Sequence, residues 1–186
     1  MRKMAKNLRF LGLPALLLAL VLIFAGCSGG DSDTWHDVTN LSQLNGTWQG
    51  SYSQSMTIRE FFEAFMGEWN DLFQNQFGNM TIRMSMDLNV TINSSTMRMT
   101  GTMRQTETYS GGNIATLWPE FRSNAIASGA TVNDSNYSIT YTESFNEPIS
   151  MDDYEGTQIN QNGNKMRIPM SEMGFPGNNY FVLNRR

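Results

Sequence analysis

Apolar and polar residues alternate strictly along residues 80–92, and a second alternation follows along residues 97–108. Period-two alternation of this length is typical of a β-strand that buries one face. The turn residues between the two runs predict a β-hairpin, and a loop at Ser94 and Ser95 would place Met86 opposite Met103. In that register the apolar positions of both runs share one face: Met80, Ile82, Met84, Met86, Leu88, Val90, Ile92, Met97, Met99, Gly101 and Met103.

Shorter alternations predict further strands at residues 47–56, 136–146, 157–160, 165–170 and 179–185. An eighth strand is expected at 149–153, and the Asn162-Gly163 step predicts a hairpin turn. Long antiparallel strands with one buried face and one wet face favour a sheet that curls into a barrel. The expected fold is therefore mainly β, an antiparallel up-and-down β-barrel of about seven or eight strands with two inserted helices.

Residues 57–77 interrupt the β pattern with helical periodicity. Thr57 and Glu60 are spaced as a capping box at the start of this amphipathic helix. Packed on the sheet, or laid over the barrel mouth as a lid, it would present an aromatic face that includes Phe62, Phe65 and Trp69. A second, short helix is expected at 118–128, with Pro119 in its first turn.

The first 26 residues have the three parts of a bacterial signal peptide: a basic start, an apolar stretch over 11–24 and small residues before Cys27. The cysteine at this position resembles the lipobox of bacterial lipoproteins. The resemblance implies cleavage before Cys27 and N-terminal acyl chains, palmitate among them, on that cysteine; an uncleaved membrane anchor is the alternative. Residues 27–40 then form a flexible tether, and residues 41–186 form the barrel domain.

Cleavage would leave 9 of the 13 Lys and Arg against 17 Asp and Glu, a net charge of −8. An acidic chain of this kind argues against nucleic acid and against anionic lipid headgroups as partners. The single histidine, His36, excludes His-paired triads and multi-His zinc sites from the domain. We expect a monomer with no cofactor and no metal. Ser28 after the cysteine is compatible with transport to an outer membrane.

The motif Gly46-Thr47-Trp48 opens the first expected strand and resembles the Gly-x-Trp motif of lipocalin-like barrels. Residues 162–166 and 180–185 are similar to the closing strands of small bacterial lipocalin-like domains. The resemblance implies that Trp48 packs at the closed end of the barrel under Arg185, or under Arg186 if the register shifts. The long helix at 57–77 departs from the family, which has a loop there.

Methionine is the compositional oddity, with 14 in the chain. Those on the hairpin face have three interpretations: ordinary core packing, an adaptable apolar pocket, or a copper(I) site made of soft thioethers. Gln105, Glu107 and Glu143 interrupt the apolar faces. Either those strand ends turn outward, or these side chains orient the polar head of a ligand at the pocket entrance.

The function expected from these features is non-catalytic binding of a small hydrophobic or amphipathic molecule at the cell envelope. The alternatives are a structural or protein-interaction lipoprotein whose barrel is filled by its own side chains, copper(I) binding, and acid–base hydrolysis by two carboxylates, which no residue spacing favours. The expected pocket lining is Met84, Met86, Met99, Met103, Gln105, Glu107, Tyr141 and Glu143.

Overall fold

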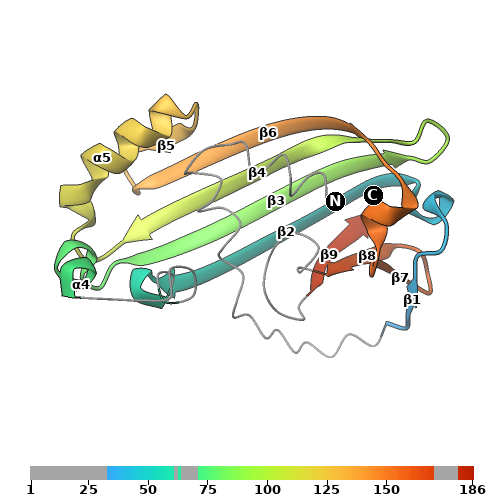
Figure 1. The fold of residues 1–186 in the computed structure, drawn as a ribbon, viewed down its shortest axis with the longest axis horizontal. Helices are drawn as coiled ribbons and strands as arrows, with labels where there is room; N and C mark the ends of the chain where they lie inside the picture. Colours follow the sequence, from blue (N-terminus) through green and yellow to red (C-terminus); the bar gives the residue numbers. More distant parts are fainter. Residues whose placement is uncertain (1–32, 61–62, 64–70, 170–179) are drawn as a thin grey trace. The chain divides into compact units, whose positions relative to one another are not determined.

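The computed structural model describes residues 33–60, 63, 71–169 and 180–186. Over these residues the protein is mainly β, with a nine-stranded antiparallel sheet in the order β1-β7-β8-β9-β2-β3-β4-β6-β5 (Figure 1). The strands are β1 (Trp35–Asp37), β2 (Gly46–Thr57), β3 (Thr81–Asn93), β4 (Arg98–Ser110), β5 (Thr131–Asn133), β6 (Ser138–Pro148), β7 (Gln158–Asn160), β8 (Lys165–Pro169) and β9 (Tyr180–Arg185). Two α-helices, α4 (Asp71–Phe77) and α5 (Ile114–Ala127), and two 3₁₀ helices, η1 (Leu41–Leu44) and η2 (Met151–Tyr154), complete the elements of this part of the chain.

Strands β1 and β5 form the two edges of this sheet, and no pairing between described residues joins them. The antiparallel β architecture predicted from the alternation is therefore confirmed, whereas closure into a barrel stays a prediction. Strand β9 pairs with β2, so the last strand of the chain lies beside the first long one.

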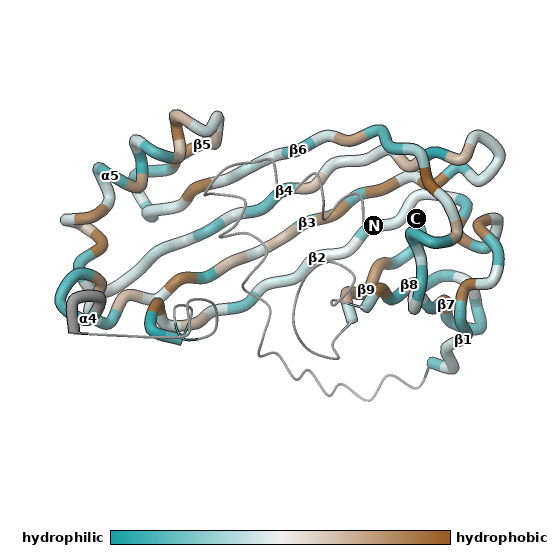
Figure 2. The backbone as a smooth tube through the Cα atoms, viewed as in Figure 1, coloured by the Kyte–Doolittle hydropathy of each residue, from teal (hydrophilic) through white to brown (hydrophobic). Residues whose placement is uncertain are grey.

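The described residues divide into two compact units. Unit 1 contains the residues up to Tyr52, Asp87–Met103 and those from Glu143 onward, and unit 2 contains Ser53–Met86 and Arg104–Thr142. The four long strands β2, β3, β4 and β6 each contribute residues to both units. Alternating hydrophobic and hydrophilic residues are visible along β3 in Figure 2.

The β3–β4 hairpin buries the predicted face, but its turn is longer than expected. Residues 94–97 are the turn, and Met97 adopts a positive φ of 52° there and is 45% exposed. A Cβ on Gly101 would lie 3.0 Å from the Cα of Val90, so Gly101 is beside Val90, where the predicted register placed Met99. The predicted register is thus wrong by two residues, and the face survives because side chains alternate with a period of two.

Unit 1 has a buried core beside β2 and β9. Trp48, Leu44 and Leu183 are fully buried, and the indole N–H of Trp48 donates to the carbonyl of Leu44 at 2.7 Å. The expected strand at 149–153 is instead the helix η2, whose capping box joins Ser150 to Asp153. Side chains that hydrogen-bond to nearby backbone groups, as in a capping box, compete with the backbone hydrogen bonds of a strand.

The N-terminal boundary predicted for the domain is too late in the chain. Residues assigned to the tether pair with the sheet, since Trp35 lies opposite Asn160 in the β1–β7 ladder. Val38 is buried, and its N–H donates to the carbonyl of Thr157 at 3.0 Å. Three residues are too few to show a period-two pattern, so the alternation did not reveal this strand.

The helices of unit 2 follow the predicted ones in part. The capping box is confirmed, because the N–H of Thr57 donates to Glu60 Oε2 at 2.7 Å and the N–H of Glu60 donates to Thr57 Oγ1 at 3.1 Å. Helix α5 begins four residues before the predicted start, so Pro119 lies inside the helix and not in its first turn. Its N-terminus is held against α4 by Asn113, whose amide donates to two carbonyls of residues 75 and 76.

Among the described helices, none has the length and apolar character needed to cross a membrane.

Candidate functional site: a buried carboxyl on the methionine face

The polar cluster of unit 2 is built on the inward-facing positions at the end of β4. Gln105, Glu107 and Tyr109 alternate along the strand and are all buried, Glu107 to 3% exposure. The Tyr109 hydroxyl donates to Glu107 Oε2 at 2.6 Å, and the Gln105 amide donates to Glu107 Oε1 at 3.2 Å. Both oxygens of one buried carboxyl group are therefore held by neutral donors from its own strand.

Strand β3 lines one side of this cluster with methionine. The Ser85 hydroxyl donates to the carbonyl of Thr106 at 3.5 Å, so these two residues lie side by side on neighbouring strands. Antiparallel pairing then places Met86 beside Gln105 and Met84 beside Glu107, on the opposite face from Ser85. Both methionines are buried, so thioethers surround the polar groups on this side.

Strand β6 lines the other side. The hydroxyls of Thr106 and Thr140 lie 3.0 Å apart, and the N–H of Tyr109 donates to the carbonyl of residue 137 at 3.0 Å. In the register that these contacts define, Tyr141 is beside Gln105 and buried Ile139 is beside Glu107. The cluster on β4 is therefore flanked by side chains from its two neighbouring strands, β3 and β6.

Helix α5 packs over the cluster. The rings of Phe121 and Tyr109 are 5.1 Å apart at their centroids, and Trp118 meets the ring of Tyr137 edge-on at 5.3 Å. Ser128, the C-cap of the helix, donates its hydroxyl to the carbonyl of Ala125 at 2.8 Å. Aromatic rings of the helix thus exclude water from the phenol that holds Glu107.

Burial controls the ionisation of the cluster. Desolvation raises the pKa of Glu107 above its ordinary value, although the hydrogen bonds from Tyr109 and Gln105 oppose the change. Desolvation and the nearby Glu107 also raise the pKa of Tyr141, to about 12, and that of Tyr109 well above the ordinary range. No Lys, Arg or His of the described chain neutralises Glu107 by an ion pair.

The predicted pocket residues do not all join this cluster. Met84, Met86, Gln105, Glu107 and Tyr141 belong to unit 2, where the contacts above bring them together. Met99 is buried in unit 1, where its sulfur accepts a hydrogen bond from Tyr154 at 3.6 Å. Met103, half-buried, and Glu143, exposed, are also in unit 1. Glu143 is exposed and takes no part in the cluster.

One residue of the cluster, Tyr109, was absent from the predicted lining. It continues the inward alternation two positions beyond Glu107, so the same pattern that placed Glu107 also contains the signal for Tyr109. Two predicted features, the lid residues Phe62, Phe65 and Trp69 and the acylation site Cys27, lie outside the described residues.

The contact expected between Trp48 and Arg185 is present in unit 1. The two residues are partners in the β2–β9 ladder, and the guanidinium carbon lies 4.4 Å from the centroid of the indole ring. Arg185 also donates to the carbonyl of Gln43 at 2.6 Å. The arginine thus covers one face of the buried indole ring.

Within the described chain, His, Cys, Asp and Glu form no group of three or more that could hold a metal ion. Comparison with protein-family models, with curated proteins and with solved structures found no match to this chain.

Proposed function

We propose that the protein is a membrane-anchored lipoprotein that binds a small amphipathic molecule at the methionine face of unit 2. The apolar part of the ligand would contact Met84 and Met86, whose flexible thioethers adapt to varied hydrophobic guests. Its polar head would hydrogen-bond to Glu107. The observation that carries the proposal is a carboxyl group buried among methionines and aromatic rings, without a cation among the described residues.

Folding alone gives little reason for a carboxyl group at this position. Burial of a charged carboxylate costs free energy unless it is paired and hydrogen-bonded, and well-packed apolar residues in place of buried charged groups are often neutral or stabilising. A carboxylate has about four lone-pair positions, and Tyr109 and Gln105 occupy two of them. The remaining positions suit a ligand head with N–H or O–H donors, such as an amine or an alcohol.

A lipocalin-like barrel and an outer-membrane location are part of this proposal. Pairing of β9 with β2 supports the barrel, because the first and last strands of an up-and-down barrel lie side by side. The cation–π contact of Arg185 with Trp48 supports it further. The signal sequence before Cys27 supports the envelope location and an anchor of acyl chains.

Displacement of an apolar fluorescent probe tests the proposal. Saturable probe binding that is released by alkyl amines or alcohols is expected for the native protein and lost in Met86→Lys. Glu107→Gln should weaken the alkyl amine selectively, whereas Glu143→Gln, which makes the same chemical change at an exposed position, should have no effect. A folded protein that binds no apolar probe would refute the proposal.

One observation favours the structural alternative. Gln105 and Tyr109 already satisfy both oxygens of Glu107, as in a core filled by its own side chains. A structural or interaction lipoprotein is therefore the second candidate, and absence of probe binding would select it. Copper(I) binding by methionines is tested separately by titration with cuprous ion under reducing conditions.

A further inference from the structure

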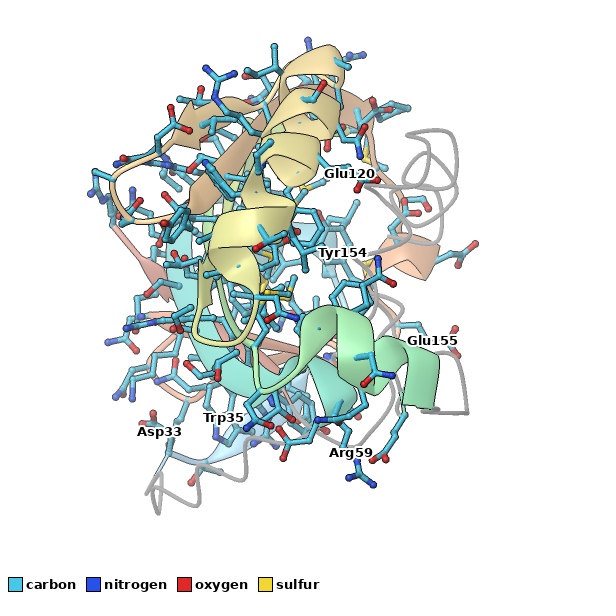
Figure 3. All side chains as sticks on the ribbon, turned by 90° about the vertical axis from the view of Figure 1, so that its left-hand side faces the viewer. Asp33, Trp35, Arg59, Glu120, Tyr154 and Glu155 are labelled. Atoms are coloured by element: carbon cyan, nitrogen blue, oxygen red, sulfur yellow. The ribbon has the colours of Figure 1, made fainter. Side chains whose placement is uncertain are left out.

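The N-terminal segment is fastened to the sheet of unit 1 as soon as it enters the described part of the chain. Strand β1 pairs with β7 over three residues, and the carbonyl of Thr34 accepts a hydrogen bond from the N–H of Gln161 at 2.9 Å. Figure 3 labels Asp33 and Trp35, the residues on either side of Thr34. This backbone pairing fixes the point at which the chain leaves the sheet.

Side chains reinforce the pairing. Lys165 Nζ lies 2.6 Å from Asp33 Oδ2, in an ion pair that is only partly exposed. The guanidinium carbon of Arg167 lies 4.5 Å from the centroid of the Trp35 ring and 4.4 Å from that of the Tyr180 ring. Stacking of an arginine between two aromatic rings holds the strand with more than backbone hydrogen bonds. The exit point of the chain at Asp33 is therefore a fixed position on unit 1.

The distance from this exit point to Cys27 is limited by covalent geometry. Cys27 precedes Asp33 by six residues, and a chain of that length spans about 20 Å at most, whatever its conformation. Acyl chains on Cys27 would lie in the bilayer. Asp33, where the chain leaves the edge of unit 1, is then held within about 20 Å of the lipid-bearing cysteine.

This end of unit 1 is basic although the chain as a whole is acidic. Lys165 is opposite Asn184 in the β8–β9 ladder, and the N–H of Arg185 donates to the carbonyl of residue 164 at 2.8 Å. The end therefore gathers four of the 9 basic residues that follow Cys27, namely Lys165, Arg167, Arg185 and Arg186, against two carboxylates of the same edge, Asp33 and Asp37, which leaves a local excess of two positive charges. The negative net charge of the whole chain argues against anionic headgroups as partners, but it does not describe this locally basic end.

Two exposed side chains with apolar surface lie in the first half of β9, beside Arg167 and Pro169 of β8. Tyr180 is 40% exposed and Val182 is 36% exposed. They alternate on the strand with buried Phe181 and Leu183, so they face away from the core. Tyrosine and tryptophan beside basic residues are typical of surfaces at the membrane–water interface.

We propose that this end of unit 1, defined by β1, the β7–β8 turn and the last residues of β9, docks on the anionic phospholipid headgroups of the membrane that carries the acyl chains. The inference rests on acylation of Cys27, which is part of the proposed function. Attraction of clustered Lys and Arg to anionic lipid supplies the contact, and the short connection to the anchor keeps this end near the surface.

The test uses the full mature, acylated protein in phospholipid vesicles. A cysteine introduced by Asn162→Cys in the β7–β8 turn carries a fluorophore, and nitroxide headgroup lipids quench it when the turn lies at the surface. Strong quenching is expected with phosphatidylglycerol present. Arg186→Gln should lower the ratio of docked to undocked protein about fivefold. Arg104→Gln removes the same charge from an exposed position of unit 2 and should leave quenching unchanged.

Trp35→Ala removes the stack on Arg167 and should release β1, which lengthens the connection and reduces quenching while circular dichroism stays β-rich. An unquenched fluorophore, or equal losses in Arg186→Gln and Arg104→Gln, would overturn the docking. Intact-mass measurement separates the two proposals. Acylated protein without quenching refutes docking alone, whereas protein without acyl chains refutes the anchor and the docking together.

Discussion

Replacement of Glu107 by glutamine should remove a pH dependence of stability that the buried carboxyl imposes. Because burial raises the pKa of Glu107 above 4.5, the folded protein retains this proton at pH values where the unfolded chain has lost it. The unfolded state then binds fewer protons, and the free energy of unfolding falls as pH rises. The stabilisation is full below about pH 4.5 and is lost as pH rises through the pKa of the folded state.

The size of the effect follows from the proton count. One proton held only by the folded state changes the free energy of unfolding by about 1.4 kcal/mol per pH unit. Glutamine has the shape of the protonated acid and can accept from Tyr109, so Glu107→Gln keeps the packing without the titration. Tyr109 and Tyr141 do not titrate in this range, because their pKa values are raised.

Urea unfolding at a series of pH values from about 4 to 7.5 measures the difference between the native protein and Glu107→Gln. The native protein should lose stability relative to the variant as pH rises, and the two curves should converge at the acid end. Glu143→Gln, at an exposed position, should follow the native curve. Parallel curves for the native protein and Glu107→Gln across the range would show that the folded carboxyl titrates normally, and the burial argument would fail.

Three further substitutions test the packing by urea unfolding. Gly101→Ala would bring a Cβ within 2.2 Å of a backbone carbonyl and should lower the free energy of unfolding by about 2–3 kcal/mol. The control Ser144→Ala, at an exposed position, should change it by no more than about 0.5 kcal/mol. Equal effects of the two substitutions would contradict the close approach of β3 and β4. Arg185→Gln removes the cation over Trp48 and should cost about 0.5–2 kcal/mol, and no loss would show that the stack contributes nothing. Thr57→Ala removes one half of the capping box and should cost about 1 kcal/mol; an unchanged midpoint would mean that the cap is dispensable.

The sequence predicted the faces of the long strands better than their pairing. Alternation reports which side chains share a face, and the burial of Met84, Met86 and Val90 agrees with it. Register depends on the turn, and the positive φ of Met97 was not expected of a methionine. Short elements were missed for a different reason: three-residue strands such as β1 and β5 have too few positions to show a period.

The sequence predicted only those residues of the candidate site whose position follows from the alternation along a strand. Inward positions for Gln105 and Glu107 followed from the alternation of β4, and both are buried. The register of β4 and β6 puts Glu143 beside Met103 on the same face, but β6 is half-buried or exposed beyond residue 140, so Glu143 is not buried. Contacts to helix α5, such as that of Phe121 with Tyr109, depend on tertiary packing that no local pattern contains.

The division of the long strands between the two units has a consequence for engineering. The backbone passes from one unit to the other four times, at residues 52–53, 86–87, 103–104 and 142–143, each time in the middle of a β-strand. No linker connects the units, so neither can be excised as a contiguous fragment or fused elsewhere as a module. Circular permutation is restricted in the same way, and new termini belong in the turns that join the strands.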